Sequence, residues 1–168
     1  KERKMMRCFY YPHRDALDPL HNDDAIYTPN VVVFKSDTSY PRLLAENKWY
    51  KVNVITSAAP NLRQNPSNSM NGGDGYKRAE ITKENLLALL ENRIHRILAI
   101  AEKKGNEVVI LGAFGCGAFS NPPEIVAKAM KNEVEKFRKS FKTIEFAVYC
   151  PPYDDTNYRV FKRVLETI

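Results

Sequence analysis

Residues 108 to 123 read Val-Val-Ile-Leu-Gly-Ala-Phe-Gly-Cys-Gly-Ala-Phe-Ser-Asn-Pro-Pro, and this stretch decides the fold. Its four apolar residues, Val108 to Leu111, are typical of a strand covered on both faces of a sheet. Asn121 stands where a helix N-cap belongs, Pro122 at the first helical position, and Glu124 completes a capping-box pattern. The sequence therefore predicts a strand, a glycine-rich loop and a helix in direct succession.

The loop between that strand and helix contains three glycines, Gly112, Gly115 and Gly117. Glycine allows the backbone to approach a ligand closely, and the following helix directs free N–H groups and the positive end of its dipole toward the loop. These features favour an anion site such as one for a pyrophosphate. A tight strand-to-helix turn is the alternative, and the spacing matches neither the P-loop nor the Gly-x-Gly-x-x-Gly dinucleotide fingerprint.

Strands and helices alternate along the rest of the chain. Thr82 is a candidate cap for a long helix, and Gly105 follows that helix as a stop signal. The predicted strands cover 31–35, 49–57, 107–111 and 143–150, and the predicted helices cover 83–104, 123–139 and 155–166. This order indicates an α/β fold, a three-layer α/β/α sandwich with a mixed, centrally parallel sheet.

The 168 residues are the size of a single domain, which we expect to span 1–168. A stretch rich in Asn, Ser and Gly over 64–77 is predicted to be a flexible loop, either plain surface or a flap near a ligand. Within it, 72–75 reads as a solvated turn or mobile loop. The net charge of +6 would suit nucleic acid or another polyanion, but basic residues at helix ends are also ordinary surface, and we do not expect nucleic acid.

Cysteine and histidine do not form a recognisable site in the sequence. Three cysteines at wide spacing favour neither a disulfide framework nor zinc, and they suit a reducing cytoplasm. Cys116 is read as a small packed side chain rather than a nucleophile, since no histidine partner is identifiable. We expect no metal and no cofactor, and no run of residues is long and apolar enough to span a membrane.

The glycine stretch, Leu111-Gly-Ala-Phe-Gly-Cys-Gly-Ala-Phe-Ser-Asn-Pro-Pro-Glu-Ile-Val-Ala127, resembles the signature of the microbial-type poly(ADP-ribose) glycohydrolase family, whose members have a macrodomain fold. Further similar segments occur in the same order, at 27–34, 54–62, 93–98 and 144–148. The resemblance covers roughly residues 9 to 165. It implies ADP-ribose or its polymer as the ligand, with ADP-ribosylated proteins as further partners.

Ligands of open α/β sheets bind at the carboxyl ends of the strands, so the segments 57–61, 112–121 and 150–154 should converge. Asn61 offers an amide or closes its own turn, and Phe114 is favoured as core. The resemblance places Phe119 beside the distal ribose and Tyr153 with Asp154 near adenine. The predicted ligand-binding residues are Ala59, Asn61, Gly112, Ala113, Phe114, Gly115, Cys116, Gly117, Ala118, Phe119, Asn121 and Tyr153.

The sequence departs from the family in one respect. The family's catalytic loop, a triple glycine followed by Gln-Glu-Glu, is not found among these residues, and we expect it upstream of Lys1, where a glutamate would act as the general acid. The catalytic residues within this chain are therefore predicted to be none. The expectation is ADP-ribose binding by this chain and glycohydrolase activity of the intact protein. Two alternatives are a non-catalytic ADP-ribose or nucleotide-binding module and a basic nucleic-acid-associated domain.

Overall fold

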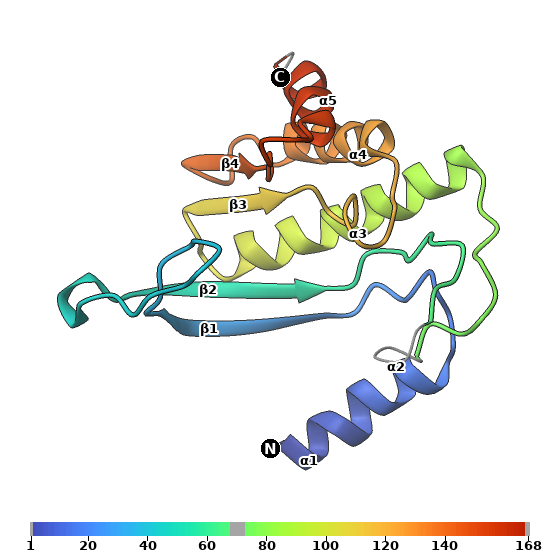
Figure 1. Ribbon diagram of the computed structural model, residues 1–168, viewed down its shortest axis with the longest axis horizontal. Coiled ribbons are helices and arrows are strands. Elements are labelled where there is room, and N and C mark those ends of the chain that lie inside the picture. The colour runs from blue at the N-terminus through green and yellow to red at the C-terminus, as the bar shows by residue number, and fades with distance from the viewer. Residues whose placement is uncertain (1, 68–72, 167–168) are drawn as a thin grey trace. The chain divides into compact units, whose positions relative to one another are not determined.

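The computed structural model describes residues 2–67 and 73–166. These residues form two compact units, one of Lys1–Asp23 with Ala58–Ile168 and one of Asp24–Ser57. Figure 1 shows helices and short strands in both halves of the sequence, so the predicted α/β class is confirmed. Residues 68–72 of the loop predicted over 64–77, including Gly72, lie outside the described residues.

The smaller unit is built on an antiparallel pair of strands, β1 (Ala25–Val33) and β2 (Tyr50–Ser57), with the short 3₁₀ helix η2 (Glu46–Lys48) before β2. The pairing register shifts between Thr28 and Val31, at Pro29 and Asn30. Proline cannot donate to the ladder, and Asn30 adopts a left-handed φ of 58°, so a bulge absorbs both residues. The strand predicted over 31–35 therefore begins earlier, at Ala25.

The larger unit contains a parallel strand pair and three long helices. Its elements are α3 (Lys83–Lys103), β3 (Val108–Gly112), α4 (Pro123–Lys136), β4 (Thr143–Ala147) and α5 (Thr156–Leu165). Helix α4 is the crossover between β3 and β4, and α4 packs against both α3 and α5. A continuous helical segment precedes them, formed by α1 (Glu2–Met5), the π-helix η1 (Met6–Tyr10) and α2 (Tyr11–Asp15).

Apolar side chains at helical spacing form the core of this unit. Leu90, Ile94 and Leu98 of α3 are at most 1% exposed, and Val126 of α4 and Phe161 of α5 are equally buried. Burial of such a side chain contributes about 1.5–3 kcal/mol to folding. The buried apolar side chains of α3 and α4 therefore lie in the larger unit, where α4 packs against both α3 and α5.

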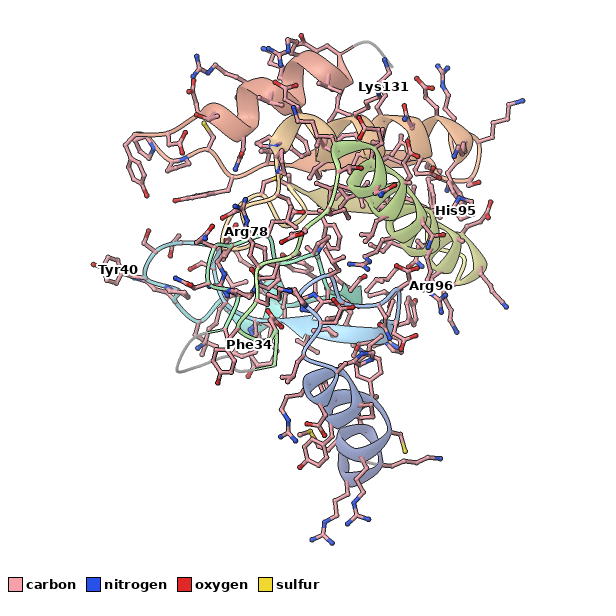
Figure 2. The ribbon with its side chains drawn as sticks, turned by 90° about the vertical axis from the view of Figure 1, so that its right-hand side faces the viewer. Phe34, Tyr40, Arg78, His95, Arg96 and Lys131 are labelled. Atoms are coloured by element: carbon pink, nitrogen blue, oxygen red, sulfur yellow. The ribbon has the colours of Figure 1, made fainter. Side chains whose placement is uncertain are left out.

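A buried carboxylate joins α3 to α4. Glu133 is 2% exposed, and its Oε2 lies 2.9 Å from His95 Nδ1 on α3. Lys136 Nζ donates to Glu133 Oε1 at 2.5 Å, and this hydrogen bond raises the pKa of the lysine. Figure 2 labels His95 on α3. The pairing satisfies a charge that would otherwise be costly to bury.

The predicted helix ends are confirmed for α3 and corrected for α4. Thr82 Oγ1 accepts a hydrogen bond from Asn85 N at 3.2 Å, and Gly105 follows α3 with a left-handed φ of 68°. Helix α4 instead begins at Pro123, with Pro122 in the N-cap position and no side-chain cap. The predicted capping role of Asn121 is therefore wrong, because its amide is used elsewhere, as described below.

Strand β3 also differs from its prediction. Val109 and Leu111 are 8% and 7% exposed, but Val108 and Ile110 are 53% and 64% exposed. Side chains alternate between the two faces of a strand, so the helices cover one face of β3 while the other face stays accessible. Coverage on both faces, as predicted from four consecutive apolar residues, is wrong for the described part of the chain.

Within the described part of the chain, no helix is both long and apolar enough to cross a membrane.

Candidate functional site

The glycine loop leaves β3 as a series of tight turns. Cys116 N donates to Ala113 O at 3.0 Å, Ser120 N to Gly117 O at 3.1 Å, and Asn121 N to Gly115 O at 3.0 Å. Gly115 has a φ of +74°, a region that side chains disfavour. The backbone thus folds back on itself between β3 and α4, and the sequence prediction of a glycine loop at this position is confirmed.

Asn121 fastens this loop to the segment that follows Ser57. Its Nδ2 donates to Pro60 O at 2.7 Å and to Gly115 O at 3.1 Å. The residue is 2% exposed. The buried Asn121 side chain therefore hydrogen-bonds to two loops. The local sequence pattern could not distinguish this role from that of an N-cap.

The same two loops touch at Gly115 and Ala59. A Cβ atom placed on Gly115 would lie 2.7 Å from Ala59 Cβ and closer still to the Asn121 amide. Leu62 N also donates to Phe119 O at 2.9 Å. The predicted convergence of 57–61 with 112–121 is therefore found, and it requires glycine at 115 and a small residue at 59.

Asn61 is completely buried in this contact region, at 0% exposure. Its Nδ2 donates to Asp74 Oδ2 at 2.6 Å and to Pro66 O at 3.0 Å. Its Oδ1 accepts from Arg63 N at 3.3 Å and from Arg63 Nε at 3.0 Å. The bond to Arg63 N is the turn-closing contact that the sequence left open as an alternative for this residue.

Asp74 brings an unexpected residue, His21, into the site. Asp74 is 5% exposed, and its Oδ1 lies 2.9 Å from His21 Nε2. The other ring nitrogen, Nδ1, lies 2.7 Å from Ala59 O. Gly73, Asp74 and Gly75 are all buried, so the prediction of a solvated turn is wrong for these three residues. The Asn, Ser and Gly residues of this segment predicted an exposed loop, so nothing in the sequence indicated that the Asp74 carboxylate is buried.

Arg93, on α3, is the second side chain that the sequence reading did not assign. Its side chain is 1% exposed, and Nε lies 3.1 Å from Asp23 Oδ1. Nη1 donates to Ala58 O at 2.8 Å and to Leu20 O at 3.1 Å. Burial lowers the pKa of this guanidinium, and the hydrogen bond to Asp23 opposes the shift. Arg93 therefore ties the start of the 58–61 segment to 20–23.

The ends of the 64–77 loop are also joined. Arg78, labelled in Figure 2, donates from Nη1 to Gln64 Oε1 at 3.2 Å. Both residues line a groove of about 890 Å³ that runs along the start of α3 to Asn85. Together with buried Asp74, this contact fixes the base of the segment predicted to be flexible.

The two phenylalanines of the loop are half-buried. The Phe119 ring centroid lies 5.9 Å from that of His21, and Arg63 Cζ lies 5.7 Å from the same Phe119 ring. Phe119 thus lies near both an imidazole and a guanidinium. Phe114 is partly exposed rather than fully buried.

Cys116 is protonated and unreactive in this setting. Burial raises the pKa of its thiol to about 12. Its Sγ contacts Phe114 O at 3.9 Å. A thiol with such a pKa is a poor nucleophile at neutral pH, in agreement with the reading of Cys116 as a packing residue.

The third predicted segment follows β4. Gly112 pairs with Ala147, so the loops after β3 and β4 start at the same edge of the sheet. Tyr153 is 88% exposed. Asp154 Oδ1 accepts from Thr156 N at 2.9 Å, and backbone hydrogen bonding lowers the pKa of this carboxyl. The role predicted for Tyr153 in binding stays a prediction.

The chemistry of this arrangement is that of a backbone cradle. Gly117 and Ala118 are exposed, and apart from the two chain neighbours of Gly117 no atom of the described residues lies within 4 Å of a Cβ placed on Gly117. Among residues 2–67 and 73–166, no group of three or more His, Cys, Asp or Glu side chains is arranged to hold a metal ion. The loop therefore offers main-chain groups and small residues to a ligand.

No protein-family model and no curated protein matches the sequence. Solved structures do match. Poly(ADP-ribose) glycohydrolase from Thermomonospora curvata is 31% identical with a TM-score of 0.78 over 96% of this chain. The same enzyme bound to the inhibitor ADP-HPD matches with a TM-score of 0.77. Poly(ADP-ribose) glycohydrolase from Deinococcus radiodurans in complex with ADP-ribose is 28% identical, with a TM-score of 0.77 over 96% of this chain.

The match covers almost all of this chain but only part of each relative. The chain spans 60% of the length of the Deinococcus protein and 54% of the length of the Thermomonospora protein. The glycine loop and the α/β elements that support it lie within the matched part, as the sequence resemblance implied. The chain is therefore similar in fold to part of these poly(ADP-ribose) glycohydrolases.

Proposed function

We propose that this chain binds ADP-ribose and that the glycine loop receives the diphosphate. The observation that carries the proposal is the loop itself, which is locked from behind by Asn121 and open in front at Gly117. A rigid, glycine-lined backbone at the end of a strand is suited to an anion that needs close approach. The bound ADP-ribose of the Deinococcus relative supports the same ligand class.

The proposed ligand-binding set is the one predicted from the sequence. Ala59, Gly115 and Asn121 form the contact that shapes the cradle, while Asn61 fixes the adjoining turn. Phe119, near His21 and Arg63, offers an aromatic face to a ribose. Tyr153 completes the set as an exposed ring. The full set is Ala59, Asn61, Gly112, Ala113, Phe114, Gly115, Cys116, Gly117, Ala118, Phe119, Asn121 and Tyr153.

A substitution at Gly117 tests this assignment. Because a Cβ at this position meets no atom of the described residues within 4 Å, apart from its chain neighbours, Gly117→Val should leave the melting temperature unchanged. It should nevertheless weaken ADP-ribose at least about tenfold in titration calorimetry, because the side chain occupies the approach to the backbone. Equal affinity of the variant and the parent chain would remove the diphosphate from this loop.

For a longer protein that contains this chain, we propose hydrolysis of the O-glycosidic bonds between ADP-ribose units. A glutamate outside these residues would protonate the leaving ribose oxygen as an oxocarbenium-like centre develops, while the loop described here holds the diphosphate. Incubation of this chain with ADP-ribose polymer should therefore show binding without release of ADP-ribose. Release would mean that a catalytic group lies within the 168 residues. A binding module without activity is the second candidate.

We also propose a cytoplasmic location and ADP-ribosylated proteins as partners. The three cysteines, Cys8, Cys116 and Cys150, are free thiols, and two of them are exposed. Exposed free thiols suit a reducing compartment. A protein that recognises ADP-ribose would also meet it as a protein modification.

A further inference from the structure

His21 has both ring nitrogens directed at acceptors. Nδ1 lies 2.7 Å from the carbonyl oxygen of Ala59, which can only accept, so Nδ1 carries a hydrogen. Nε2 lies 2.9 Å from Asp74 Oδ1. An ionised carboxylate can also only accept, so the pair needs one further proton, either on Nε2 or shared with Asp74. The pair of His21 and Asp74 therefore holds two protons. One lies between Nδ1 and the Ala59 carbonyl oxygen, and the other lies between Nε2 and the Asp74 carboxylate.

The backbone at His21 is in an uncommon conformation. Its φ is 59°, the left-handed region that residues other than glycine seldom adopt. His21 N donates to Asp18 O at 3.2 Å, and Arg93 Nη2 donates to His21 O at 3.4 Å. The backbone N–H and C=O of His21 are thus both hydrogen-bonded, while its ring contacts Ala59 and Asp74.

The charged groups around His21 come from four segments. Asp74 faces the ring, Arg93 faces its carbonyl, Asp23 pairs with Arg93, and Asp18 lies three residues earlier in the chain. Arg63 lies across the Phe119 ring, at 5.7 Å from its centroid. Within this surrounding set, His21 bonds directly to Ala59 and Asp74, and the contact between Nε2 and Asp74 Oδ1 is the one that needs the further proton.

Those two bonds reach the proposed site. Ala59 is the residue against which Gly115 packs, and Asp74 Oδ2 accepts from Asn61 Nδ2 at 2.6 Å. The His21 ring also lies beside Phe119. If the shared proton is lost, a lone pair on the imidazole faces an acceptor at under 3 Å, and the contact becomes repulsive. The 59–61 segment would then lose its support behind the cradle.

We propose that His21 is a positioning residue of the ADP-ribose site, which holds Ala59, Asn61 and Phe119 through the proton that it shares with Asp74, so that ligand affinity falls as pH rises. The inference rests on the proposed function. His21 itself need not touch the ligand.

The test is titration calorimetry with ADP-ribose on the full chain from about pH 5.5 to about pH 9, the range in which histidine changes charge. We expect affinity to drop about tenfold toward the upper end. His21→Gln should bind weakly with little pH dependence, whereas His13→Gln and His95→Gln should keep the parent profile. Constant affinity of the parent chain over this range, or an unchanged profile in His21→Gln, would overturn the proposal.

Asp74→Asn is the decisive variant, because the asparagine amide has nearly the same shape. Its Nδ2 can donate to a neutral His21 Nε2 while its Oδ1 accepts from Asn61 Nδ2, so the bonds to His21 and Asn61 are both kept without the extra proton. Asp74→Asn should therefore bind ADP-ribose at high pH as well as the parent chain does at low pH. Affinity that still falls with pH in this variant would contradict the shared proton.

Failure of this inference can be told from failure of the proposed function. If the parent chain binds ADP-ribose at no pH, the proposed function is wrong. If it binds equally at every pH, only the role of His21 is wrong. Thermal melting of each variant at both ends of the pH range shows whether a loss of binding reflects unfolding, and nitrogen-15 NMR of the His21 ring reports its protons without any ligand.

Discussion

Single residues set the geometry of this site, because their small side chains leave room for neighbouring groups to pack closely. Gly115 leaves room for the Asn121 amide, and Ala59 leaves room for Gly115. Cys116 is enclosed so that its thiol keeps its proton. The loop therefore presents the backbone to solvent and hides the groups that could react.

The protonated thiol leads to a prediction for Cys116. Its pKa in the folded chain, about 12, lies above the ordinary value of 9.0, so the thiol stabilises the fold below about pH 9 and this contribution is lost as pH rises toward 12. At about pH 8, iodoacetamide should modify the exposed Cys8 and Cys150 readily and Cys116 slowly. Peptide mass spectrometry separates the three sites.

Denaturant provides the control for this experiment. In an unfolded chain all three cysteines should react at similar rates, since the difference comes from burial. Labelling of Cys116 as fast as that of Cys8 in the folded chain would contradict the enclosed thiol.

At the scale of elements, strand β3 combines two different surfaces in five residues. The face with Val109 and Leu111 is covered by helices, and the face with Val108 and Ile110 is accessible. A continuous apolar run in the sequence cannot reveal this difference, because both faces read as hydrophobic. Only the placement of the helices decides which side is core.

Paired substitutions in β3 test this asymmetry. Leu111→Ala should lower the free energy of unfolding by about 2–5 kcal/mol, because it leaves a cavity beneath the helices. Ile110→Ala should cost less than about 1 kcal/mol, since its side chain is largely exposed already. Urea denaturation of the two variants measures the difference. Equal losses would show that the outer face of β3 is also packed.

The sequence was sufficient for elements with strong local signals. The glycine loop, the cap at Thr82 and the stop at Gly105 were predicted at the correct residues, because each depends on a few neighbours in the chain. The parts that were missed depend on distant partners. Neither His21 nor Asp74 has a local pattern, and Asn121 matched a cap while its amide was bonded 61 residues away.

At the scale of the whole molecule, Arg93 connects α3 to two further segments of the larger unit, 20–23 and Ala58. It bonds to Leu20, His21 and Asp23 on one side and to Ala58 on the other. All of its partners are carbonyl or carboxylate oxygens, so a neutral replacement would leave several acceptors unsatisfied. One buried guanidinium thus organises the surroundings of the proposed site.

Replacement of this arginine should therefore be costly. Arg93→Met should lower the free energy of unfolding by about 3–5 kcal/mol, because it removes the cation that pairs with Asp23 and the donor to the buried carbonyls of Leu20 and Ala58. The matched control is Arg96→Met on the exposed side of the same helix (Figure 2), which should change stability by less than about 0.5 kcal/mol. Chemical denaturation followed by circular dichroism compares them. Similar losses in both variants would show that the buried bonds of Arg93 contribute little.

The bonds that build the site span long stretches of chain: 38 residues between His21 and Ala59, 61 between Pro60 and Asn121, and 73 between Leu20 and Arg93. Each of these contacts closes a large loop, and loop closure is an entropic cost that slows folding. Helices α3 and α4, whose internal backbone hydrogen bonds join neighbouring residues, can form before any of these loops is closed. The cradle should consequently be among the last parts of the chain to assemble after translation, and ligand capture would mark the completion of folding.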